Sequence, residues 1–268
     1  MGIEVTLCIT SYNRKNKLEN CIDSFLKTTL FPLEKTEIVI VDNGSDDEKT
    51  CEYIQNLKID KVGSFQKVIN KKNDYPYCLR RAKNQAREIA KGKYFIDCPD
   101  DHIFVVKSNW IQDSINFLET TNEKISCICH YAYPLYRFHK PNNLMIPSSE
   151  DGDFFISQLK GYADYHIMSR SSYHDIGLYD ETLEFSPNSE SDYMERSYDM
   201  GYRRALLRNP VSIIVDENFF GPGKFAKLKA PLRIDDVKDL EVSGRPVSCE
   251  ELKLLSERNS VLEVFSDE

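Results

Sequence analysis

The sequence predicts an α/β fold in which helices flank a largely parallel sheet. The main observation is that short apolar runs of strand length alternate with amphipathic helical patterns four times in the first part of the chain. Parallel neighbours need such crossover helices, and these crossovers are right-handed. A second observation is size: 268 residues, 41% of them hydrophobic, are enough to bury a substantial core.

The first two strand and helix pairs follow from periodicity and capping. Residues 4–10 (EVTLCIT) are strand-like, and residues 36–42 (TEIVIVD) form a second apolar run. Between them, residues 15–28 carry apolar side chains at helical spacing on one face: Leu18, Cys21, Ile22, Phe25 and Leu26. An acidic first turn at residues 46–48 then predicts a helix that continues to about residue 58.

The third and fourth pairs complete the predicted parallel sheet. Residues 65–70 predict a strand, and residues 77–91 predict a helix that ends at Gly92. Residues 94–98 predict the fourth strand. Because ligands of such sheets bind at the carboxyl ends of the strands, the residues that follow each strand are the candidate functional residues.

The second half of the chain has a different pattern. Residues 110–120 predict an amphipathic helix and residues 125–130 a strand, but residues 131–160 are rich in Tyr, Pro, Asn and Ser and break the alternation. Such a stretch favours an irregular binding surface. A second ordered block is predicted over residues 161–215, followed by a charged tail with a short helical pattern near residues 250–257.

Composition excludes some partners and favours others. The net charge is 35 minus 43, or −8, which disfavours nucleic acid or an anionic membrane as the main partner. An anionic ligand would then need a local cation, and a divalent metal is the simplest one. The eight cysteines are scattered through mostly apolar runs, as expected of buried thiols in a reducing compartment. No run predicts a transmembrane segment, so we expect a cytoplasmic protein.

Adjacent carboxylates follow the fourth predicted strand. Asp100 and Asp101 stand directly after the run that ends in Asp97-Cys98-Pro99. Carboxylates at such a strand end are suited to hold a metal ion beside a phosphate. Asp is also common in turns, so the pair is open to a second interpretation, in which it only caps the following segment.

Five short motifs carry a resemblance to a known family. They are residues 5–14 (VTLCITSYNR), 41–45 (VDNGS), 82–84 (AKN), 99–102 (PDDH) and 177–181 (GLYDE). In this order and spacing, over residues 4–216, the chain resembles glycosyltransferase family 2. The resemblance implies a GT-A type nucleotide-binding sheet flanked by helices, with a smaller acceptor-binding half and a C-terminal extension.

The resemblance also implies how the chain is divided and what it does. Residues 1–108 would bind the nucleotide sugar, residues 109–216 would bind the acceptor and supply the catalytic base, and residues 217–268 would form a loop and tail. The implied activity is metal-dependent, inverting transfer of a sugar from a nucleoside diphosphate, UDP favoured, to a saccharide or other hydroxyl acceptor in polysaccharide or glycoconjugate synthesis. The alternative is a catalytically silent module that binds nucleotide sugar or docks to a partner.

For the metal, Mn²⁺ or Mg²⁺, the resemblance favours Asp101 as the ligand. Asp100 would face elsewhere, toward the ribose or the waters of the metal, because neighbouring residues on an extended chain point in opposite directions. The usual Asp-x-Asp triplet of the family is absent, and His102 occupies the place of a second ligand.

For the nucleotide, Asp42 matches the carboxylate that accepts a hydrogen bond from a pyrimidine ring N–H in the family. Alone, an Asp before Asn-Gly-Ser would favour a plain turn or helix cap. The other matching positions form the loop after the first strand, where they would pack on the nucleotide: Thr10, Tyr12, Asn13 and Arg14. The Arg14 side chain has two equal interpretations, a diphosphate contact and a solvated arginine at a helix start.

Lys83 stands where the family more often has Arg, and the exchange loses bidentate geometry. Arg80 or Arg81 would then substitute as the phosphate or base contact. For the catalytic base, the resemblance implies a Glu-Asp pair before a helix that ends in a Gly-Tyr-Arg-like turn. Counting back from residues 201–203, this position falls on Glu190, with Asp192 as the second choice, although the pair is rearranged here. Either acid would also be explained by its favourable place in the first turn of a helix.

Overall fold

The computed structural model describes residues 2–71, 79–104, 107–130, 145–147, 154–157, 165–182, 191–207, 212–214, 241–242 and 245–246. Within these residues the helices are α1 (Lys15–Thr28), α2 (Glu48–Asn56), α3 (Leu79–Ile89), α4 (Trp110–Thr120), α5 (Arg170–Ile176) and α6 (Ser191–Asp199), with a short 3₁₀ turn at Leu33–Lys35.

The strands of the main sheet are β1 (Val5–Ser11), β2 (Thr36–Asp42), β3 (Ser64–Ile69), β4 (Tyr94–Pro99), β6 (Ile125–His130), β7 (Met145–Pro147), β8 (Phe154–Ser157), β9 (Tyr165–Ser169) and β10 (Arg203–Leu207). Two small pairs are β5 (His102–Phe104) with β11 (Ser212–Ile214), and β12 (Glu241–Val242) with β13 (Arg245–Pro246).

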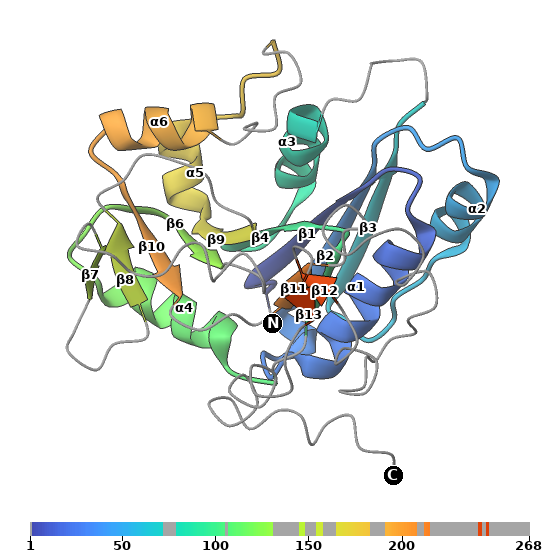
Figure 1. The fold of residues 1–268 in the computed structure, drawn as a ribbon, viewed down its shortest axis with the longest axis horizontal. Coiled ribbons are helices and arrows are strands. Elements are labelled where there is room, and N and C mark those ends of the chain that lie inside the picture. Colours follow the sequence, from blue (N-terminus) through green and yellow to red (C-terminus); the bar gives the residue numbers. More distant parts are fainter. Residues whose placement is uncertain are drawn as a thin grey trace.

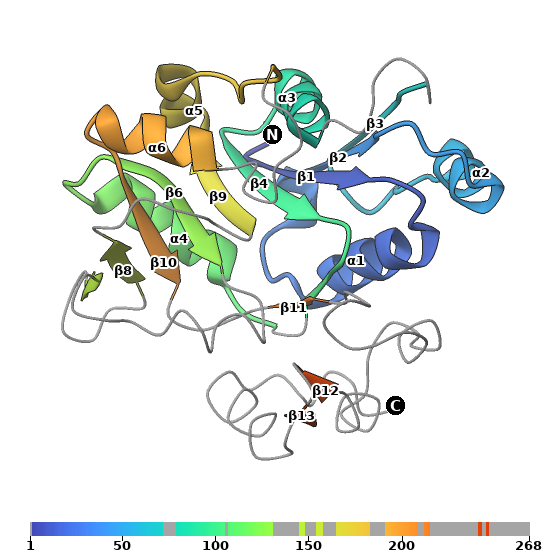
Figure 2. The same ribbon diagram turned by 45° about the horizontal axis from the view of Figure 1, so that its top comes forward.

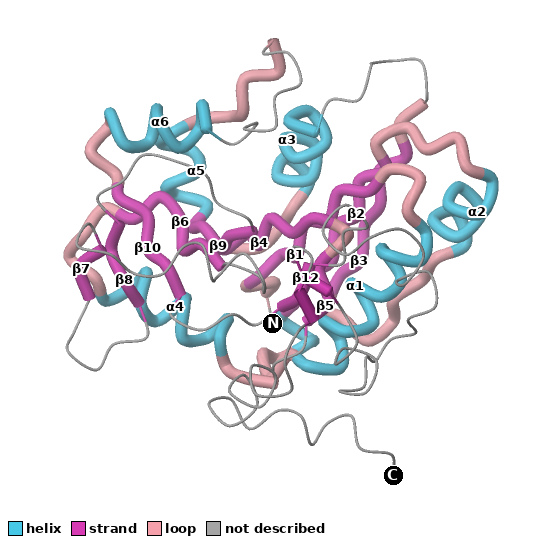
Figure 3. The backbone as a smooth tube through the Cα atoms, viewed as in Figure 1, coloured by secondary structure: helices cyan, strands magenta, loops and turns pink. Residues whose placement is uncertain are grey.

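The described strands of the main sheet follow the order β3-β2-β1-β4-β9-β6-β10-β8-β7. The tube in Figure 3 shows them as one continuous band. Strands β3, β2, β1 and β4 are mutually parallel, as the sequence predicted. Strand β9 then runs antiparallel between β4 and β6, so the two halves of the chain share a single sheet.

Helices cover both faces of this sheet. Figures 1 and 2 show α3, α5 and α6 along one face and α1 and α4 along the other. The hydrophobic core is divided in the same way, because alternate residues of each strand point to opposite faces. In β1, Leu7 and Ile9 belong to the core under α1 and α4, while Cys8 belongs to the core under α3.

A charged cluster lies within the core on the α3 face. Arg87 of α3 is fully buried and donates to Asp97 of β4, and its Nη2 lies 2.9 Å from the hydroxyl of Tyr179. Its guanidinium also faces the rings of Tyr179, Tyr173 and Tyr193, at 4.4, 5.0 and 5.4 Å from their centroids. The buried ion pair between Arg87 and Asp97 therefore joins α3 to β4, and the contacts of Arg87 with Tyr179 add the segment after α5.

The AKN and GLYDE motifs meet in this cluster. Asn84 of α3 donates from Nδ2 to the backbone carbonyl of Tyr179 and to the carboxylate of Glu181, at 3.0 and 2.8 Å. Its Oδ1 accepts from the backbone N–H of Tyr179 at 3.0 Å. This amide therefore ties α3 to the segment that follows α5.

Candidate functional site

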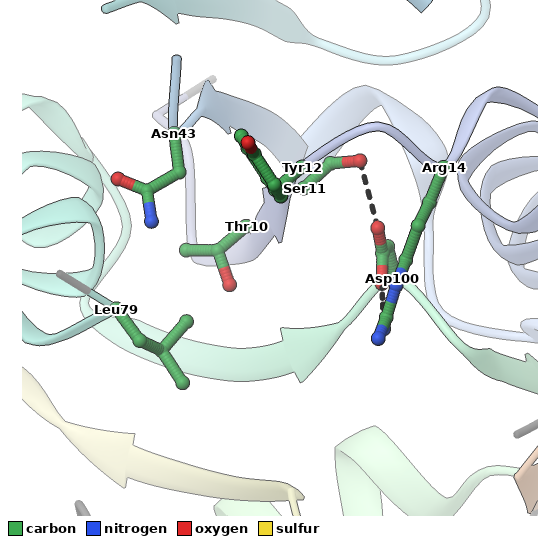
Figure 4. Close-up of a pocket in the computed structure, with 7 residues that line it drawn as sticks. All are labelled: Thr10, Ser11, Tyr12, Arg14, Asn43, Leu79 and Asp100. Carbon is green, nitrogen blue, oxygen red and sulfur yellow. Dashed lines mark hydrogen bonds and ion pairs between the residues drawn. The ribbon is translucent and has the colours of Figure 1, made fainter. Parts of the chain in front are cut away.

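The site is built where parallel strands end at the same edge of the sheet. Strand β1 lies between β2 and β4, and the register pairs Thr10 with Pro99. The next residues along these strands, Ser11 and Asp100, consequently meet, and the Ser11 hydroxyl donates to Asp100 Oδ2 at 2.7 Å. A pocket of about 280 Å³ opens here (Figure 4), and it is lined by Thr10, Ser11, Tyr12, Arg14, Asn43, Leu79 and Asp100.

The loops after β1 and β2 are fastened to each other. Asn13 has a φ of 54°, in the left-handed region that Asn tolerates better than most residues. In this conformation its Oδ1 accepts from the backbone N–H groups of Asp46 and Asp47 at 2.9 and 3.0 Å. Its own N–H donates to the Ser45 hydroxyl at 2.9 Å. The structure thus uses Asn13 to shape the loop, and it is not one of the residues that line the pocket.

Asp42 is buried at the end of β2 and accepts from both the backbone N–H and the hydroxyl of Ser45. Burial raises the pKa of Asp42, and the bonds from Ser45 offset part of that rise. The turn interpretation of Asp42 is therefore confirmed, since it holds the Asn43-Gly44-Ser45 turn. A carboxylate can accept more than these bonds, so the turn does not conflict with base recognition.

Asn43 was missed by sequence reasoning although it lines the pocket. Its Nδ2 is buried and has no hydrogen-bond partner among the described residues. A buried donor without a partner is costly, and it favours a ligand that supplies an acceptor oxygen. The signal in the sequence was its position directly after Asp42, at the end of a strand.

Asp100 and Asp101 share one cation, the residue directly before α1, so their side chains do not face opposite ways as the sequence predicted. The Nη1 atom of Arg14 lies 3.2 Å from Asp100 Oδ1 and 3.3 Å from Asp101 Oδ2. Asp100 is buried, whereas the side chain of Asp101 is 14% exposed and that of Arg14 is 40% exposed. Burial, together with the adjacent charge of Asp101, raises the pKa of Asp100 to about 6, even though Arg14 and Ser11 act in the opposite direction.

These two carboxylates fit a divalent cation that the ligand also coordinates. Both carboxylates lie within 3.3 Å of a single Arg14 nitrogen, and carboxylate oxygens suit Mg²⁺ and Mn²⁺. The described residues contain no group of three or more His, Cys, Asp or Glu that could hold a metal alone. Magnesium is commonly held by one or two carboxylates plus substrate phosphates, so Asp100 and Asp101 are a sufficient protein contribution.

His102 lies away from this arrangement. It is fully buried on β5, and its Nδ1 lies 3.0 Å from the Ser212 hydroxyl of β11. The expectation that it replaces the second acid of an Asp-x-Asp triplet rested on sequence adjacency. Since its ring is bonded inside the protein, we leave His102 out of the proposed metal site.

The Lys83 side chain is likewise buried. Its side chain is 5% exposed, its Nζ is 4.0 Å from Asp97 Oδ2, and it faces the ring of Tyr179. The residue does not line the pocket, and its charge is directed to the buried cluster around Arg87. The position of Lys83 therefore does not support the expected contact between its side chain and the nucleotide. Arg80 is buried and Arg81 half-buried on the same helix.

Of the two base candidates, Glu190 lies outside the described residues. Asp192 is in the first turn of α6, where its Oδ2 accepts from Arg196 Nε at 3.3 Å. Arg196 in turn donates to the backbone carbonyls of Ile176 and Leu178, at 2.8 and 2.6 Å. Asp192 thus orients an arginine that fastens α6 to the end of α5, which supports its structural interpretation.

A comparison with protein families decides the identity of the chain. The sequence profile described as glycosyl transferase family 2 matches residues 6–177. The chain belongs to this family. The match contains the strand ends that form the pocket.

Two curated relatives carry glycosyltransferase names. The Escherichia coli UDP-Glc:alpha-D-GlcNAc-diphosphoundecaprenol beta-1,3-glucosyltransferase WfaP is 30% identical over 136 residues, which is 51% of this chain and 47% of the relative. An uncharacterized glycosyltransferase from Rickettsia felis is 27% identical over 188 residues, 67% of this chain and 29% of the relative. The chain therefore spans about half of the first relative's length and less of the second's.

Solved structures show the same fold at low sequence identity. Staphylococcus aureus TarS 1-349 superposes with a TM-score of 0.57 at 15% identity, covering 80% of this chain and 61% of that one. The mannosyltransferase PcManGT from Pyrobaculum calidifontis, in complex with GDP-Man and Mn²⁺, gives 0.54 at 16% identity, covering 80% and 56%. The GT-A fold expected from the sequence is thus confirmed. No described helix is both long enough and apolar enough to cross a membrane.

Proposed function

We propose that this glycosyltransferase is metal-dependent and inverting, and that its donor is a nucleoside diphosphate sugar, UDP favoured. The observation that carries the proposal is the pocket at the ends of β1, β2 and β4, which is lined by Asn43 at one strand end and by Asp100 at another. Asp42, the last residue of β2, directly precedes Asn43 and is not itself a lining residue. Asp42 and Asn43 offer a hydrogen-bond acceptor and a donor suited to the edge of a pyrimidine base. Asp100 offers negative charge for a metal-bound diphosphate.

Each side chain has a distinct part in this proposal. The Asp42 carboxylate accepts from a ring N–H of the base, and Asn43 Nδ2 donates to a neighbouring carbonyl oxygen. Asp101, with Asp100 beside it, holds Mn²⁺ or Mg²⁺, which when bound neutralises the charge that develops on the leaving diphosphate. Ser11 orients Asp100 through their 2.7 Å hydrogen bond, and Tyr12 supplies a ring along the pocket wall.

The names of similar proteins support the donor class. The E. coli relative is named for a UDP-glucose donor and a lipid-diphosphate-linked sugar acceptor, and a TarS structure contains UDP-GlcNAc. We extend this to the present chain as a proposal: a UDP-sugar donor, a saccharide or other hydroxyl acceptor, and a place in polysaccharide or glycoconjugate synthesis. A cytoplasmic location is part of the same proposal, supported by described cysteines that are all free thiols.

A thermal-shift screen tests the proposed donor class. Ligands that bind only the native state raise its melting temperature by mass action. We expect UDP with Mn²⁺ to stabilise the protein more than either alone, and GDP or dTDP to do so less. If no nucleoside diphosphate shifted the melting temperature with or without Mn²⁺, the proposed function would be wrong.

The base is tested by two conservative variants. We expect Glu190→Gln to lower turnover by about a hundredfold or more with little change in donor affinity, since a positioned base contributes on the order of 10²–10⁴ in rate. Asp192→Asn is expected to act mainly on stability, because it removes the partner of Arg196. Single-turnover rates and donor titrations separate the two effects. Wild-type rates in both variants would exclude both residues as the base.

The silent-module alternative has one observation in its favour, which is that Asp192 is engaged by Arg196. It predicts donor binding without turnover. Release of nucleoside diphosphate from a bound nucleotide sugar, with or without an acceptor, excludes this alternative.

A further inference from the structure

Arg14 occupies the position between the two carboxylates that the proposed metal would need. A single nitrogen, Nη1, bridges Asp100 Oδ1 at 3.2 Å and Asp101 Oδ2 at 3.3 Å (Figure 4 shows its approach to Asp100). We propose that Arg14 is a resident counter-ion of this pair, and that a divalent metal displaces it when the donor binds. This inference rests on the proposed function and concerns how the same site is loaded.

Geometry makes the two cations mutually exclusive. Asp100 Oδ2 accepts from Ser11, whereas Arg14 Nη1 lies against Asp100 Oδ1 and Asp101 Oδ2, the two oxygens that a cation shared by both residues would use in this arrangement. A divalent metal would lie about 2.1 Å from its oxygen ligands. A cation held by these two oxygens would therefore be close to the guanidinium nitrogen that now lies against them. Two positive charges at that separation repel strongly, so the arginine must leave as the metal enters.

The arginine contact is of a kind that is easily displaced. The contact with the two carboxylates is made through one nitrogen, both distances exceed 3 Å, and the Arg14 side chain is 40% exposed although Asp100 is buried. Such a contact is weaker than a bidentate arginine pair. The backbone before Arg14 is fixed, because Asn13 is bonded to the loop after β2. Displacement therefore needs only a side-chain rotation.

The pocket gives the released arginine a new partner. Arg14 already lines the pocket proposed for the donor, so its guanidinium can turn toward diphosphate oxygens there. Phosphate accepts the planar fork in bidentate fashion, which the two carboxylates do not in this arrangement. Metal binding frees Arg14 for the diphosphate, and the diphosphate holds Arg14 away from the metal. The two ligands should therefore bind with positive coupling.

Metal binding in the absence of nucleotide tests the inference without any activity assay. We would titrate Mn²⁺ alone and follow free Mn²⁺ by electron paramagnetic resonance, for the wild type and for Arg14→Gln. Removal of the arginine that lies against both carboxylates predicts Mn²⁺ binding about three- to tenfold tighter in the variant. The same variant should bind UDP with saturating Mn²⁺ about tenfold more weakly, because it lacks the phosphate contact. The expected result is therefore that Arg14→Gln binds Mn²⁺ more tightly and UDP more weakly than the wild type.

Two further variants make the comparison specific. Lys15→Gln removes a positive charge one residue away, and its side chain faces Glu19 and the ring of Tyr53 instead of the site. Both affinities should stay within about twofold of the wild type, which excludes a general effect of charge. Asp101→Asn should weaken Mn²⁺ binding and remove most of the gain from Arg14→Gln in the double variant. Circular dichroism establishes that each variant is folded.

The outcomes separate this inference from the proposed function. If Arg14→Gln binds Mn²⁺ no more tightly than the wild type, Arg14 does not compete with the metal, even where UDP binding is normal. If neither protein binds Mn²⁺ while UDP still binds, the inference is overturned and nucleotide recognition survives. Failure of every protein to bind any nucleoside diphosphate contradicts the proposed function itself.

Discussion

Asp101→Asn is expected to lower sugar transfer by about a hundredfold or more while leaving the fold intact. The substitution removes a negative charge at the point where the leaving diphosphate is neutralised, and loss of one preorganised electrostatic partner commonly costs on the order of 10²–10³ in rate. The side chain is 14% exposed and contacts Arg14, so little packing is lost. Steady-state rates with the best donor, measured over a range of Mn²⁺ concentrations, provide the test.

Asp60→Asn is the matched control for this prediction. Asp60 is an exposed residue in the turn between α2 and β3, so the same chemical change there should leave the rate within about twofold. In Asp101→Asn we expect the Mn²⁺ concentration for half-maximal rate to rise as well. A variant that kept the wild-type rate at low Mn²⁺ would show that Asp101 does not hold the metal.

Asp97→Asn is expected to reduce the free energy of unfolding by about 3–5 kcal/mol. Asp97 lies within β4, is buried, and its carboxylate is the partner of Arg87. Removing one partner of a buried pair leaves the other charge uncompensated, which is far more costly than losing an exposed pair. Lys83 Nζ and His166 Nε2 lie 4.0 and 3.4 Å from Asp97 Oδ2. The substitution therefore also removes the negative charge that faces Lys83. Urea unfolding measures the loss.

The exposed pair Asp23–Lys27 supplies the control. It lies at 3.8 Å on the surface of α1, and Asp23→Asn should cost less than about 0.5 kcal/mol. Similar losses for Asp97→Asn and Asp23→Asn would contradict the assignment of the core cluster as a stabilising ion pair.

The same cluster predicts a dependence on pH. Burial alone would raise the pKa of Asp97, but the charge of Arg87, with His166 and Lys83, holds it well below its usual range. A carboxylate with a depressed folded-state pKa contributes stability that is fully present above its unfolded pKa of about 3.9 and is lost as pH falls toward the folded value. The difference in stability between wild type and Asp97→Asn should therefore be constant from about pH 5 to 8 and shrink below about pH 4.

The apolar periodicity of the sequence predicted most of the helices and strands. The bounds of α1, β2, α4 and β6 agree with the residues predicted for them, because each has a clear apolar period and a clear end. The antiparallel position of β9 between β4 and β6 was not predicted, since strand order depends on contacts far apart in the chain. The short pair of β5 and β11 was missed for the same reason.

The candidate site was predicted in part. The family resemblance pointed to Thr10, Tyr12 and Arg14 and the end of the fourth strand to Asp100, and these residues line one pocket. Asn13, Asp42 and Asp101 are not among its lining residues. Ser11 and Asn43 were missed because neither residue type signals a site by itself, and only the parallel register brings Ser11 to Asp100. His102 and Lys83 were assigned by adjacency and by motif, but both side chains are buried against other partners. Sequence shows which strand end a residue follows, not the face to which its side chain turns.

Release of nucleoside diphosphate from a panel of nucleotide sugars tests the central claim most directly. Purified protein would be incubated with UDP-, GDP- and dTDP-sugars, with Mn²⁺ or with a chelator, and the freed nucleotide measured over hours. We expect at least one UDP-sugar to be hydrolysed slowly with Mn²⁺, and this reaction to stop with the chelator and in Asp101→Asn. A protein that neither bound nor hydrolysed any of these donors in the presence of Mn²⁺ would contradict the proposed activity.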